Sequence, residues 1–586
     1  MRQWMVAAKK ADFYVIAEKF HVDPVVARII RNREVIGEKN IRIYLGGNLS
    51  DLSDPHQMKD MDRLGEILAQ KIRKQVHIRI IGDYDVDGVT SSHLFLTALR
   101  RVGAKVDVVI PHRIQDGYGL SLHLLQQAKE DGVDTILTCD NGIAAIDEIA
   151  WAKAQKMTVL VTDHHAVPFE EHEGRRTEKK SLADAVVNPH QQDCGYPYKE
   201  LCGAGVAWNV IRVLYENYDM DKREAEDLLD FVAMATVCDV MSLTGENRIL
   251  VKEGLKRIRH TKNIGLQALM QACNVQPENI SAYHFGYVLG PCVNATGRLD
   301  TARHALRLFE TGQETEAEEI ARDLVDLNQE RKELTLQGVE MAKKLCEEGG
   351  YEKDPVLVLF LPDVHESIAG LIAGRIREMY NRPVFVLTRG EEGVKGSGRS
   401  TENYSMYENM CGCAELFTKF GGHPMAAGLS LPEENVEKFR RKINENCPLT
   451  VEEVCPDIHI DMAMPVGYAS TELVHQFALL EPFGKDNPSP LFADRNLSIS
   501  RMWLIGKNRN VLRMSVLSEY GQPVPVIFFG DVETLFAYFT EKFGQEEVEN
   551  ALHGRKNRIL FSMVYTAKID FYQGNENLQL EMKYYR

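Results

Sequence analysis

The 586-residue sequence lacks several features that would point to common classes of protein. It has no run of about eighteen apolar residues, so we expect no membrane-spanning helix. Residues 1–20 mix charged with apolar residues and show no small-residue cleavage pattern, so we interpret them as mature protein rather than a signal peptide. The net charge is −16, which argues against indiscriminate binding of nucleic acid because phosphate contacts need cations.

The sequence also lacks paired cysteines. Its eleven cysteines are scattered, and none has the CxxC spacing of a zinc site. Cys411 and Cys413 lie closest together, separated by one glycine. We interpret all of them as reduced thiols, which favours a cytoplasmic location.

The acidic charge is unevenly distributed. Residues 501–586 contain eleven Lys or Arg and ten Asp or Glu, a net charge of +1, so residues 1–500 carry −17. Bound divalent cations would cancel part of this negative charge. Binding of nucleic acid would therefore depend on local basic patches.

The most informative feature present is an acidic motif, Asp83-Tyr84-Asp85-Val86-Asp87, after an apolar run at 76–81 that predicts a buried strand. Carboxylates at alternate positions would share one face if the strand continued. At a strand end they repel one another unless a cation lies among them. A calcium loop is excluded because Leu94 stands where its glutamate is required.

Three further polar clusters follow short apolar stretches: Asp140, then Asp163-His164-His165, then Asp239. Taken alone, Asp163-His164-His165 could equally be a capped loop with a core histidine. Carboxylate and imidazole ligands together favour Mn²⁺, and Mg²⁺ also fits the oxygen ligands. Two such cations could be held by Asp85, Asp87, Asp140, His164 and Asp239. A pair of cations suits in-line displacement at phosphorus.

Residues 76–240 alternate between strand and helix patterns. Predicted strands at 76–81, 106–110, 135–138, 158–162 and 185–187 flank helices at 89–102 and 144–155. This alternation predicts an α/β fold with a parallel sheet, in which polar residues after the strands meet at one edge. Residues 203–310 are predicted to be mostly helical. Residues 314–349 form a charged helix that we expect to bridge two domains rather than form a coiled coil.

A second α/β unit begins near residue 354. It contains a strand at 356–360, a helix at 367–379, a strand at 384–387, and glycine-rich passages at 396–400 and 421–428. After residue 473, five strand-like runs surround one predicted helix at 532–543, which favours a small oligonucleotide-binding barrel. In such a barrel Trp503, Tyr520, Phe528 and Phe529 could stack on bases or belong to the core.

The order DYDVDG, CDNG, TDHH and CDV resembles the motif series of the DHH phosphoesterase superfamily. The passages GSGRS and GGHPMAAG resemble the DHH-associated domain, and residues 480–488 resemble the entry to the barrel of single-strand-specific exonucleases in that superfamily. The resemblance implies four parts: an N-terminal segment and catalytic domain at 1–310, a linker helix at 311–350, a DHH-associated domain at 351–445, and a barrel with its entry segment at 446–586.

The resemblance also implies residue roles. The metal ligands would be Asp85, Asp87, Asp140, His164 and Asp239, with Asp83 beside them. His165 and His423 would approach the scissile phosphate, although His165 could instead be a further ligand and His423 a turn residue. Six residues would bind the phosphates or the 5′ end: Arg113, Tyr118, Asn294, Arg298, Ser397 and Arg399. Each of them could instead be a plain surface or turn residue. Asn294 and Arg298 are expected in a loop that faces phosphate.

The chain departs from the family pattern at Cys292, where arginine is usual, at 364–367, and after Arg399. The implied function is divalent-metal-dependent hydrolysis of single-stranded DNA from 5′ to 3′ in DNA repair and recombination, without a covalent intermediate. The alternatives are a phosphodiesterase or phosphatase for oligoribonucleotides or small nucleotides, and a non-catalytic DNA-binding scaffold. The resemblance is compatible with a monomer, with no membrane partner, and with a single-strand-binding protein or a helicase as protein partner.

Overall fold

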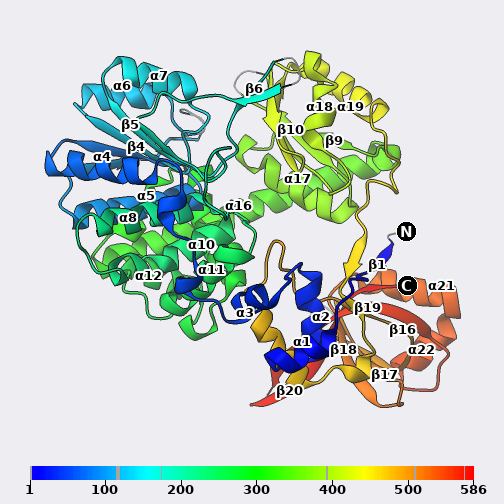
Figure 1. Cartoon of the computed structure of the whole chain (residues 1–586). Coiled ribbons are helices and arrows are strands. Elements are labelled where there is room, and N and C mark those ends of the chain that lie inside the picture. Colours follow the sequence, from blue (N-terminus) through cyan, green and yellow to red (C-terminus); the bar gives the residue numbers. More distant parts are fainter. Residues whose placement is uncertain are drawn as a thin grey trace. The chain divides into compact units, whose positions relative to one another are not determined.

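The structure is a computed structural model and describes residues 3–113, 116, 119–172, 175–390, 393–506, 510–572 and 574–586. The contacts between residues divide the chain into two compact units. The first unit contains residues 52–241 and 246–456, and the second contains residues 3–51, 242–245 and 457–586. Figure 1 shows the elements of both.

A five-stranded parallel sheet forms the centre of the N-terminal part of the first unit, which confirms the α/β prediction (Figure 1). The β2 side chains are buried throughout, as expected for a strand covered on both faces. The strands, in their order across the sheet, are β3 (Val106–Val109), β2 (Ile78–Ile81), β4 (Thr135–Cys139), β5 (Thr158–Thr162) and β8 (Ala185–Val187).

Helices cover this sheet and continue beyond it. The element α5 (Val86–Arg101) is almost entirely buried, because it packs between β2 and the helices α8 (Gly203–Glu216) and α10 (Leu229–Cys238). The helices that follow include α11 (Gly245–Ile258), α12 (Ile264–Ala272), α14 (Gly290–Leu299) and α15 (Arg303–Glu310). The mainly helical character predicted for 203–310 is confirmed.

The long charged helix is α16 (Glu314–Glu348), with nearly the predicted limits. Its N-terminal half packs on α12 and α14, and its C-terminal half packs on α17 (Glu366–Tyr380) and β9 (Leu357–Phe360). The prediction of a bridging helix is therefore confirmed.

The second α/β part is a five-stranded mixed sheet in the order β12, β13, β11, β10, β9. The strands β9 and β10 (Val384–Arg389) are parallel, while β11 (Val394–Arg399) and β13 (Ala426–Leu431) run antiparallel to their neighbours. The glycine-rich passages form β11 and the turn between β12 (Lys419–Gly422) and β13. Gly422 has a φ of 152°, and an added Cβ would lie 2.6 Å from the Ala427 Cα, so only glycine fits this turn.

The second unit is built around a six-stranded sheet in the order β15, β16, β17, β18, β20, β19, closed by pairing of β16 with β19. The predicted helix at 532–543 is α21 (Val532–Phe543), and the barrel prediction is confirmed. The strands are β15 (Met462–Ala463), β16 (Phe492–Ile505), β17 (Val511–Leu517), β18 (Pro523–Phe528), β20 (Asn575–Tyr585) and β19 (Leu560–Tyr572).

The N-terminal segment packs with this barrel. The sequence analysis grouped it with the catalytic domain, but β1 (Trp4–Val6) pairs in parallel with β14 (Ile458–Ile460), and residues 3–51 share a hydrophobic core with the barrel. Arg33 Nη1 lies 2.8 Å from Asp461 Oδ1 in a largely buried ion pair. These contacts join residues more than 400 positions apart, which no local pattern can indicate.

Membrane-spanning helices are absent from the described residues: none of the helices there combines the length and the hydrophobicity that crossing a bilayer requires.

Candidate metal centre

The acidic motif forms a turn and not an extended strand. The strand β2 ends at Ile81, as predicted, and α5 begins at Val86, so the strand does not continue through Asp83, Asp85 and Asp87. Asp85 is the N-cap of α5, and its Oδ1 accepts a hydrogen bond from the Gly88 N–H at 3.0 Å. The capping preference of aspartate therefore favours the start of α5 just beyond the sheet edge.

The N-terminus of α8 holds the Asp87 carboxylate. Its oxygens accept hydrogen bonds from the backbone N–H groups of Gly203 at 2.6 Å and Ala204 at 2.7 Å, and the partial positive charge of the helix end favours the anion. Gly203 also touches Asp140: an added Cβ would lie 2.6 Å from the Asp140 Cβ. The sequence analysis did not identify Gly203, although its place just before an apolar helical stretch was a usable signal.

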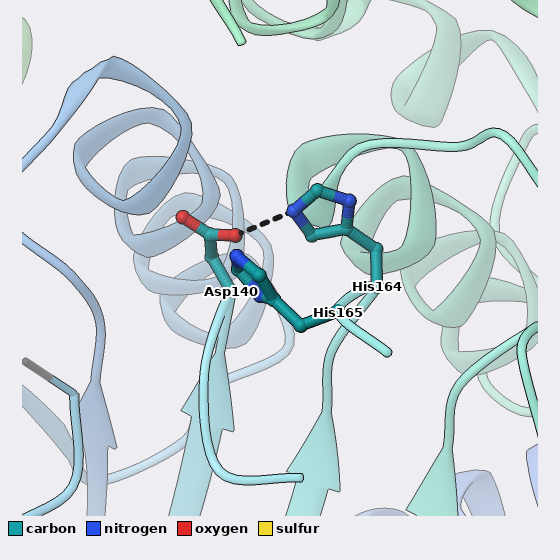
Figure 2. A group of neighbouring side chains, drawn as sticks. All are labelled: Asp140, His164 and His165. Atoms are coloured by element: carbon teal, nitrogen blue, oxygen red, sulfur yellow. Dashed lines mark ion pairs between the residues drawn. The ribbon is translucent and has the colours of Figure 1, made fainter. Parts of the chain in front are cut away.

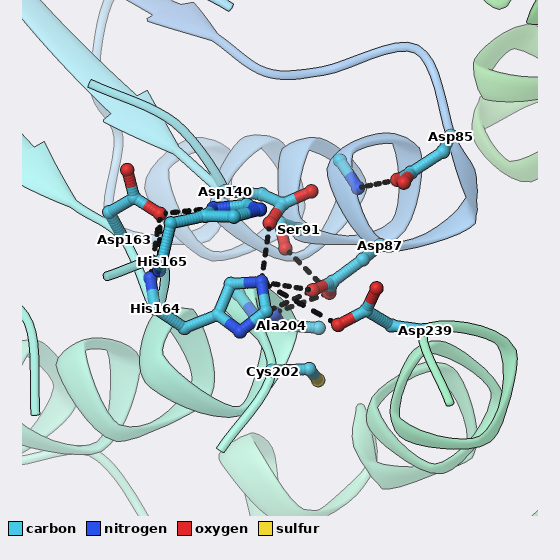
Figure 3. Close-up of polar contacts among 12 residues, drawn as sticks. Asp85, Asp87, Ser91, Asp140, Asp163, His164, His165, Cys202, Ala204 and Asp239 are labelled. Carbon is cyan, nitrogen blue, oxygen red and sulfur yellow. Dashed lines mark hydrogen bonds and ion pairs between the residues drawn. The ribbon is translucent and has the colours of Figure 1, made fainter. Parts of the chain in front are cut away.

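Asp140 and His164 lie at the ends of adjacent strands, β4 and β5. Figure 2 shows the Asp140 carboxylate facing the His164 ring, with 3.1 Å between Asp140 Oδ1 and His164 Nε2. His164 Nε2 also lies 3.6 Å from Asp87 Oδ2 and 3.6 Å from Asp239 Oδ2. Asp239 reaches the centre from the C-terminal cap of α10. One imidazole nitrogen thus faces three carboxylates brought from three separate places in the chain (Figure 3).

Asp163 orients the neighbouring histidine. Its Oδ1 accepts hydrogen bonds from the backbone N–H of His164 at 2.7 Å, from the backbone N–H of His165 at 3.0 Å, and from His165 Nδ1 at 2.8 Å (Figure 3). Its Oδ2 accepts from the Ile143 N–H at 2.9 Å. A carboxylate saturated in this way is a positioning residue for the His165 ring. The sequence analysis named the motif but gave Asp163 no role.

Three overlapping sets of ligand atoms each lie within 4.8 Å of one another. They are Asp83–Asp85–Asp140, Asp140–His164–His165 and Asp87–His164–Asp239. Every metal ligand expected from the sequence belongs to at least one set, together with Asp83 and His165. This oxygen-rich donor set with imidazole fits Mn²⁺ or Mg²⁺.

The electrostatics of the described residues also fit bound cations. Burial and the repulsion of neighbouring carboxylates raise the pKa of Asp83, Asp85 and Asp140. Burial likewise lowers the pKa of His164, which favours the neutral, ligating form. Among the described residues, the buried Asp83 Oδ1 has no hydrogen-bond partner, and the buried His164 Nε2 lies near carboxylate oxygens without hydrogen-bond geometry to any of them. Divalent cations would satisfy these atoms and relieve the repulsion.

His165 behaves differently from His164. Burial lowers its pKa, but the hydrogen bond to Asp163 and the charges of Asp163, Asp239 and Asp87 outweigh burial and raise the pKa to about 9. The pKa values of the two adjacent histidines are therefore shifted in opposite directions: burial favours the neutral ring of His164, and the neighbouring carboxylates favour the protonated ring of His165.

A cavity of about 540 Å³ within the first unit is lined by residues of both α/β parts. Arg113 lies 4.8 Å from the centre of the Tyr84 ring, and Ser397 lines the same cavity. Lys419 adds a second cation, whereas the Lys395 ammonium lies 2.8 Å from the carboxylate of Glu366, which also lines the cavity. Glycine backbone forms part of the wall, at Gly396, Gly421 and Gly428.

Two partly buried guanidinium groups, those of Arg298 and Arg399, lie near this cavity. Burial, with the positive charges of Arg113, Arg331 and Arg399, lowers the pKa of Arg298 to about 10, and burial also lowers that of Arg399. Arg298 Nη1 donates to the Ser367 carbonyl at 2.7 Å, and Arg399 Nη1 donates to the Gly398 carbonyl at 2.7 Å. Neither forms an ion pair with a carboxylate within the described part of the chain. Mutually repelling, desolvated cations of this kind are suited to an anionic ligand.

The remaining predicted site residues fall in several places. Asn294 and Arg298 lie on helix α14, so the prediction of a loop there is wrong. Asn294 Oδ1 accepts from the Val86 N–H at 3.2 Å, which ties α14 to the acidic turn. His423 is exposed, and its backbone N–H bonds to the Ala426 carbonyl. Tyr118 lies outside the described residues.

The candidate stacking residues of the barrel divide by exposure. Phe528 is buried in the core and Trp503 is half-buried, with the Arg501 guanidinium 5.7 Å from its ring centre. Tyr520 and Phe529 are 80% and 59% exposed. Only these last two, of the four candidates, present a freely accessible ring.

Comparison with known proteins gives three matching family descriptions: "DHH family, N-terminal domain" over residues 77–236, "DHHA1 domain" over 353–447 and "RecJ OB domain" over 460–584. They correspond to the parallel-sheet part, the mixed-sheet part and the barrel.

Individual relatives agree with this assignment. The single-stranded-DNA-specific exonuclease RecJ of Haemophilus influenzae is 32% identical over 582 residues, which cover 96% of each chain. The Bacillus subtilis protein of the same name is 33% identical over 511 residues, covering 86% of this chain but only 63% of the relative.

Solved structures agree as well. The Thermus thermophilus RecJ structure in complex with Mn²⁺ superposes with a TM-score of 0.79 at 24% identity, covering 100% of this chain and 79% of the other, and shows the common fold. A second structure, an exonuclease RecJ bound to manganese, has 32% identity and a TM-score of 0.56, covering 66% of this chain and 94% of that one. The chain belongs to the RecJ family of single-stranded-DNA-specific exonucleases.

Proposed function

We propose that this protein hydrolyses single-stranded DNA stepwise from the 5′ end with the help of two divalent cations. The observation that carries the proposal is the cluster of three overlapping sets of carboxylate and imidazole ligands at the sheet edge, in the same compact unit as a cavity lined by Arg113 and Lys419. The first region supplies groups for phosphodiester hydrolysis, and the second supplies groups for holding a terminal phosphate.

The ligands of the two cations would be Asp85, Asp87, Asp140, His164 and Asp239, with Asp83 beside them. Mn²⁺ is favoured over Mg²⁺ because imidazole takes part. Cations bound there would polarise the phosphoryl oxygens and make water nucleophilic near neutral pH. Relatives have been solved with Mn²⁺ and with Mg²⁺.

The protein groups around the cations have separate roles. The amides of Gly203 and Ala204 fix Asp87, and Asp163 fixes the His165 ring so that Nε2 faces the reacting phosphate. With its raised pKa, His165 carries a proton at neutral pH and can donate it to the leaving oxygen or hold the phosphate by charge. His423, on the exposed turn of the mixed sheet, would approach the same phosphate when substrate is bound.

The 5′ end would bind in the basic cavity. The proposed phosphate contacts are Arg113, Arg298, Ser397 and Arg399. An anion there would offset the burial and the mutual repulsion that together lower the pKa of Arg298 and Arg399. Asn294 acts indirectly by holding the acidic turn through Val86. Tyr118 would pack on a base.

The barrel would hold the rest of the strand, with Tyr520 and Phe529 as the accessible stacking residues. Replacing both with alanine should weaken binding of a long oligonucleotide more than it slows cleavage of a very short one. Equal losses with both substrates would contradict this role.

The decisive experiment is hydrolysis of end-labelled oligonucleotides, single- or double-stranded, with Mn²⁺, Mg²⁺ or EDTA. We expect metal-dependent decay of the single strand only, and block of the reaction by phosphorothioate linkages at the 5′ end but not at the 3′ end. Preferential decay of duplex, or equal decay in EDTA, would overturn the proposal. Block by 3′ linkages alone would reverse the polarity.

The barrel argues against a phosphodiesterase for small nucleotides, which has no need of such a domain, and the complete ligand set argues against a non-catalytic scaffold. The proposal also places the protein in the cytoplasm as a monomer that acts in DNA repair and recombination. A single-strand-binding protein or a helicase would deliver the substrate. The molar mass of the purified protein, measured by light scattering, tests whether it is a monomer.

A further inference from the structure

Two cysteines, one at the end of α12 and one in α14, lie in contact with each other. Cys273 caps the C-terminus of α12, and Cys292 lies in the first turn of α14. Their Sγ atoms are 3.8 Å apart. The pair is separate from the proposed metal ligands and from the proposed phosphate contacts, so the hydrolysis mechanism gives it no role.

The two thiols differ in accessibility and environment. Cys273 is partly exposed, whereas Cys292 is only 1% exposed. Cys292 Sγ bonds to the Val288 carbonyl at 3.3 Å and accepts from Asn328 Nδ2 at 3.4 Å. The contact with Cys292, aided by the charge of Lys332, lowers the pKa of Cys273. An accessible, acidified thiol beside a buried second thiol is the arrangement of an oxidisable pair.

We propose that Cys273 and Cys292 are a reversible oxidation site that forms a disulfide in response to a peroxide. The Cys273 thiolate attacks one peroxide oxygen, the O–O bond breaks, and sulfenic acid and hydroxide form. The Cys292 sulfur then attacks the Cys273 sulfur, and its proton leaves with the sulfenic oxygen as water. Two thiols lose two electrons in total and the peroxide gains them. A dithiol reductant restores both thiols.

The bond would move α14 relative to α12. A disulfide requires the two sulfurs to approach to about 2 Å, which is much less than the observed separation. A shift of α14 would be transmitted to its neighbours, because two contacts tie it to the acidic turn. An added Cβ on Gly297 would lie 2.4 Å from the Tyr84 carbonyl oxygen, and Asn294 Oδ1 accepts a hydrogen bond from the Val86 N–H. Both contacts reach the turn that carries Asp85. Displacement of α14 therefore disturbs the turn.

Disulfide formation does not depend on the proposed hydrolysis, but its effect on activity rests on that function. Oxidation should lower kcat/KM on single-stranded DNA by up to about 100-fold, the scale expected for a displacement near 1 Å in an active site. A dithiol should reverse the loss.

The test treats the full-length protein with hydrogen peroxide and maps its cysteines by mass spectrometry after alkylation and digestion. We expect a linked peptide pair containing residues 273 and 292, lighter by two hydrogen atoms than the reduced pair. Cys273→Ser and Cys292→Ser should each remove the linkage and make activity resistant to peroxide. Cys411→Ser, which alters an exposed cysteine elsewhere, is the matched control and should leave both responses unchanged.

Each result has a stated meaning. Absence of the linked pair in the wild type would overturn the oxidation site even if hydrolysis is confirmed. Formation of the pair without loss of activity would overturn the coupling to the acidic turn. If Cys292→Ser lowers the melting temperature of the reduced protein, Cys273→Ser gives the same information from a position that is less buried. If peroxide lowers the activity of Cys273→Ser as much as that of the wild type, the proposal is also rejected.

Discussion

The acidic centre and the basic cavity of the first unit each gather charges of one sign, and they differ in the groups that offset the repulsion. In the acidic centre, backbone amides, a helix N-terminus and two histidines hold clustered carboxylates, and the remaining repulsion requires cations. Beside the basic cavity, Arg298 and Arg399 bond within the described part of the chain to neutral carbonyl and hydroxyl groups, and their mutual repulsion is left for an anionic ligand. We infer that the first region controls turnover and the second controls binding.

The largest expected effect comes from removing a shared ligand. Asp140→Ala should lower kcat by about 10³-fold or more, because two of the three ligand sets include Asp140. Binding of single-stranded DNA, measured by fluorescence anisotropy, should change only a few-fold. Asp140→Asn is the matched variant, because asparagine tolerates the left-handed φ of 61° and removes only the charge. Turnover within a few-fold of wild type would contradict the ligand assignment.

The second effect is on stability. Raised pKa values for Asp83, Asp85 and Asp140 mean that the metal-free protein is most stable where these groups are protonated and loses stability as pH rises through their folded-state values. Mn²⁺ at about one hundred times its Kd should restore about 3 kcal/mol at neutral pH. Thermal unfolding at several pH values, with and without Mn²⁺, measures both trends.

Asp230 provides an internal control for that experiment. Burial raises its pKa to about 6, although hydrogen bonds from Thr261 and Phe231 oppose the shift. Its ionisation costs at most about 3 kcal/mol between pH 4 and pH 7. Asp230→Asn should remove this part of the pH dependence without changing the response to Mn²⁺. A changed response would mean that the two effects are not separate.

A smaller effect is expected when a positioning residue is changed. Asp163→Asn should lower kcat about 10- to 100-fold, because it weakens the interaction that orients and charges His165. The same change in a His165→Gln background should have little further effect, and the pH profile of kcat should lose the ionisation assigned to His165. Independent, multiplicative losses would show that Asp163 does not act through His165.

The smallest effect tests the cavity. Arg399→Lys keeps the charge but loses the planar fork, so KM should rise about tenfold while kcat stays within a few-fold. The rise should be greater for substrates with a 5′-phosphate than for those with a 5′-hydroxyl. Arg389→Lys alters an exposed arginine paired with Glu433 and is the control. A fall in kcat with unchanged KM would contradict the inference that the acidic centre controls turnover and the basic cavity controls binding.

Much of the fold could be predicted from the sequence because its elements have strong periodic patterns. The helix α16 and the barrel helix α21 were expected at nearly their observed limits, and the five strands of the parallel sheet in their observed places. The meeting of Asp140 and His164 followed from parallel strands, whose C-terminal ends share one edge.

The errors and omissions have local physical causes. The capping bond between Asp85 and the Gly88 N–H depends on backbone geometry, so the sequence does not show which way the carboxylates of the acidic motif point. Residues 290–298 contain glycine and proline and were expected to be a loop, but proline is compatible with the first turn of α14. The amides that hold Asp87 come from Gly203 and Ala204, more than a hundred residues away. Such contacts leave no mark on local composition.

The pairing of residues 3–51 with residues 457–586 has a consequence for biosynthesis. Roughly 400 residues separate the two segments, so at about 5–20 residues per second the ribosome needs about 20–80 s to supply the partner of the first helices. During that interval apolar side chains such as Val26 and Ile30, which are fully or nearly fully buried in the finished protein, have no barrel to cover them. The nascent chain therefore depends on chaperones or on temporary contacts. A truncated product that lacks its last segment would keep this surface uncovered, which marks it for proteolysis.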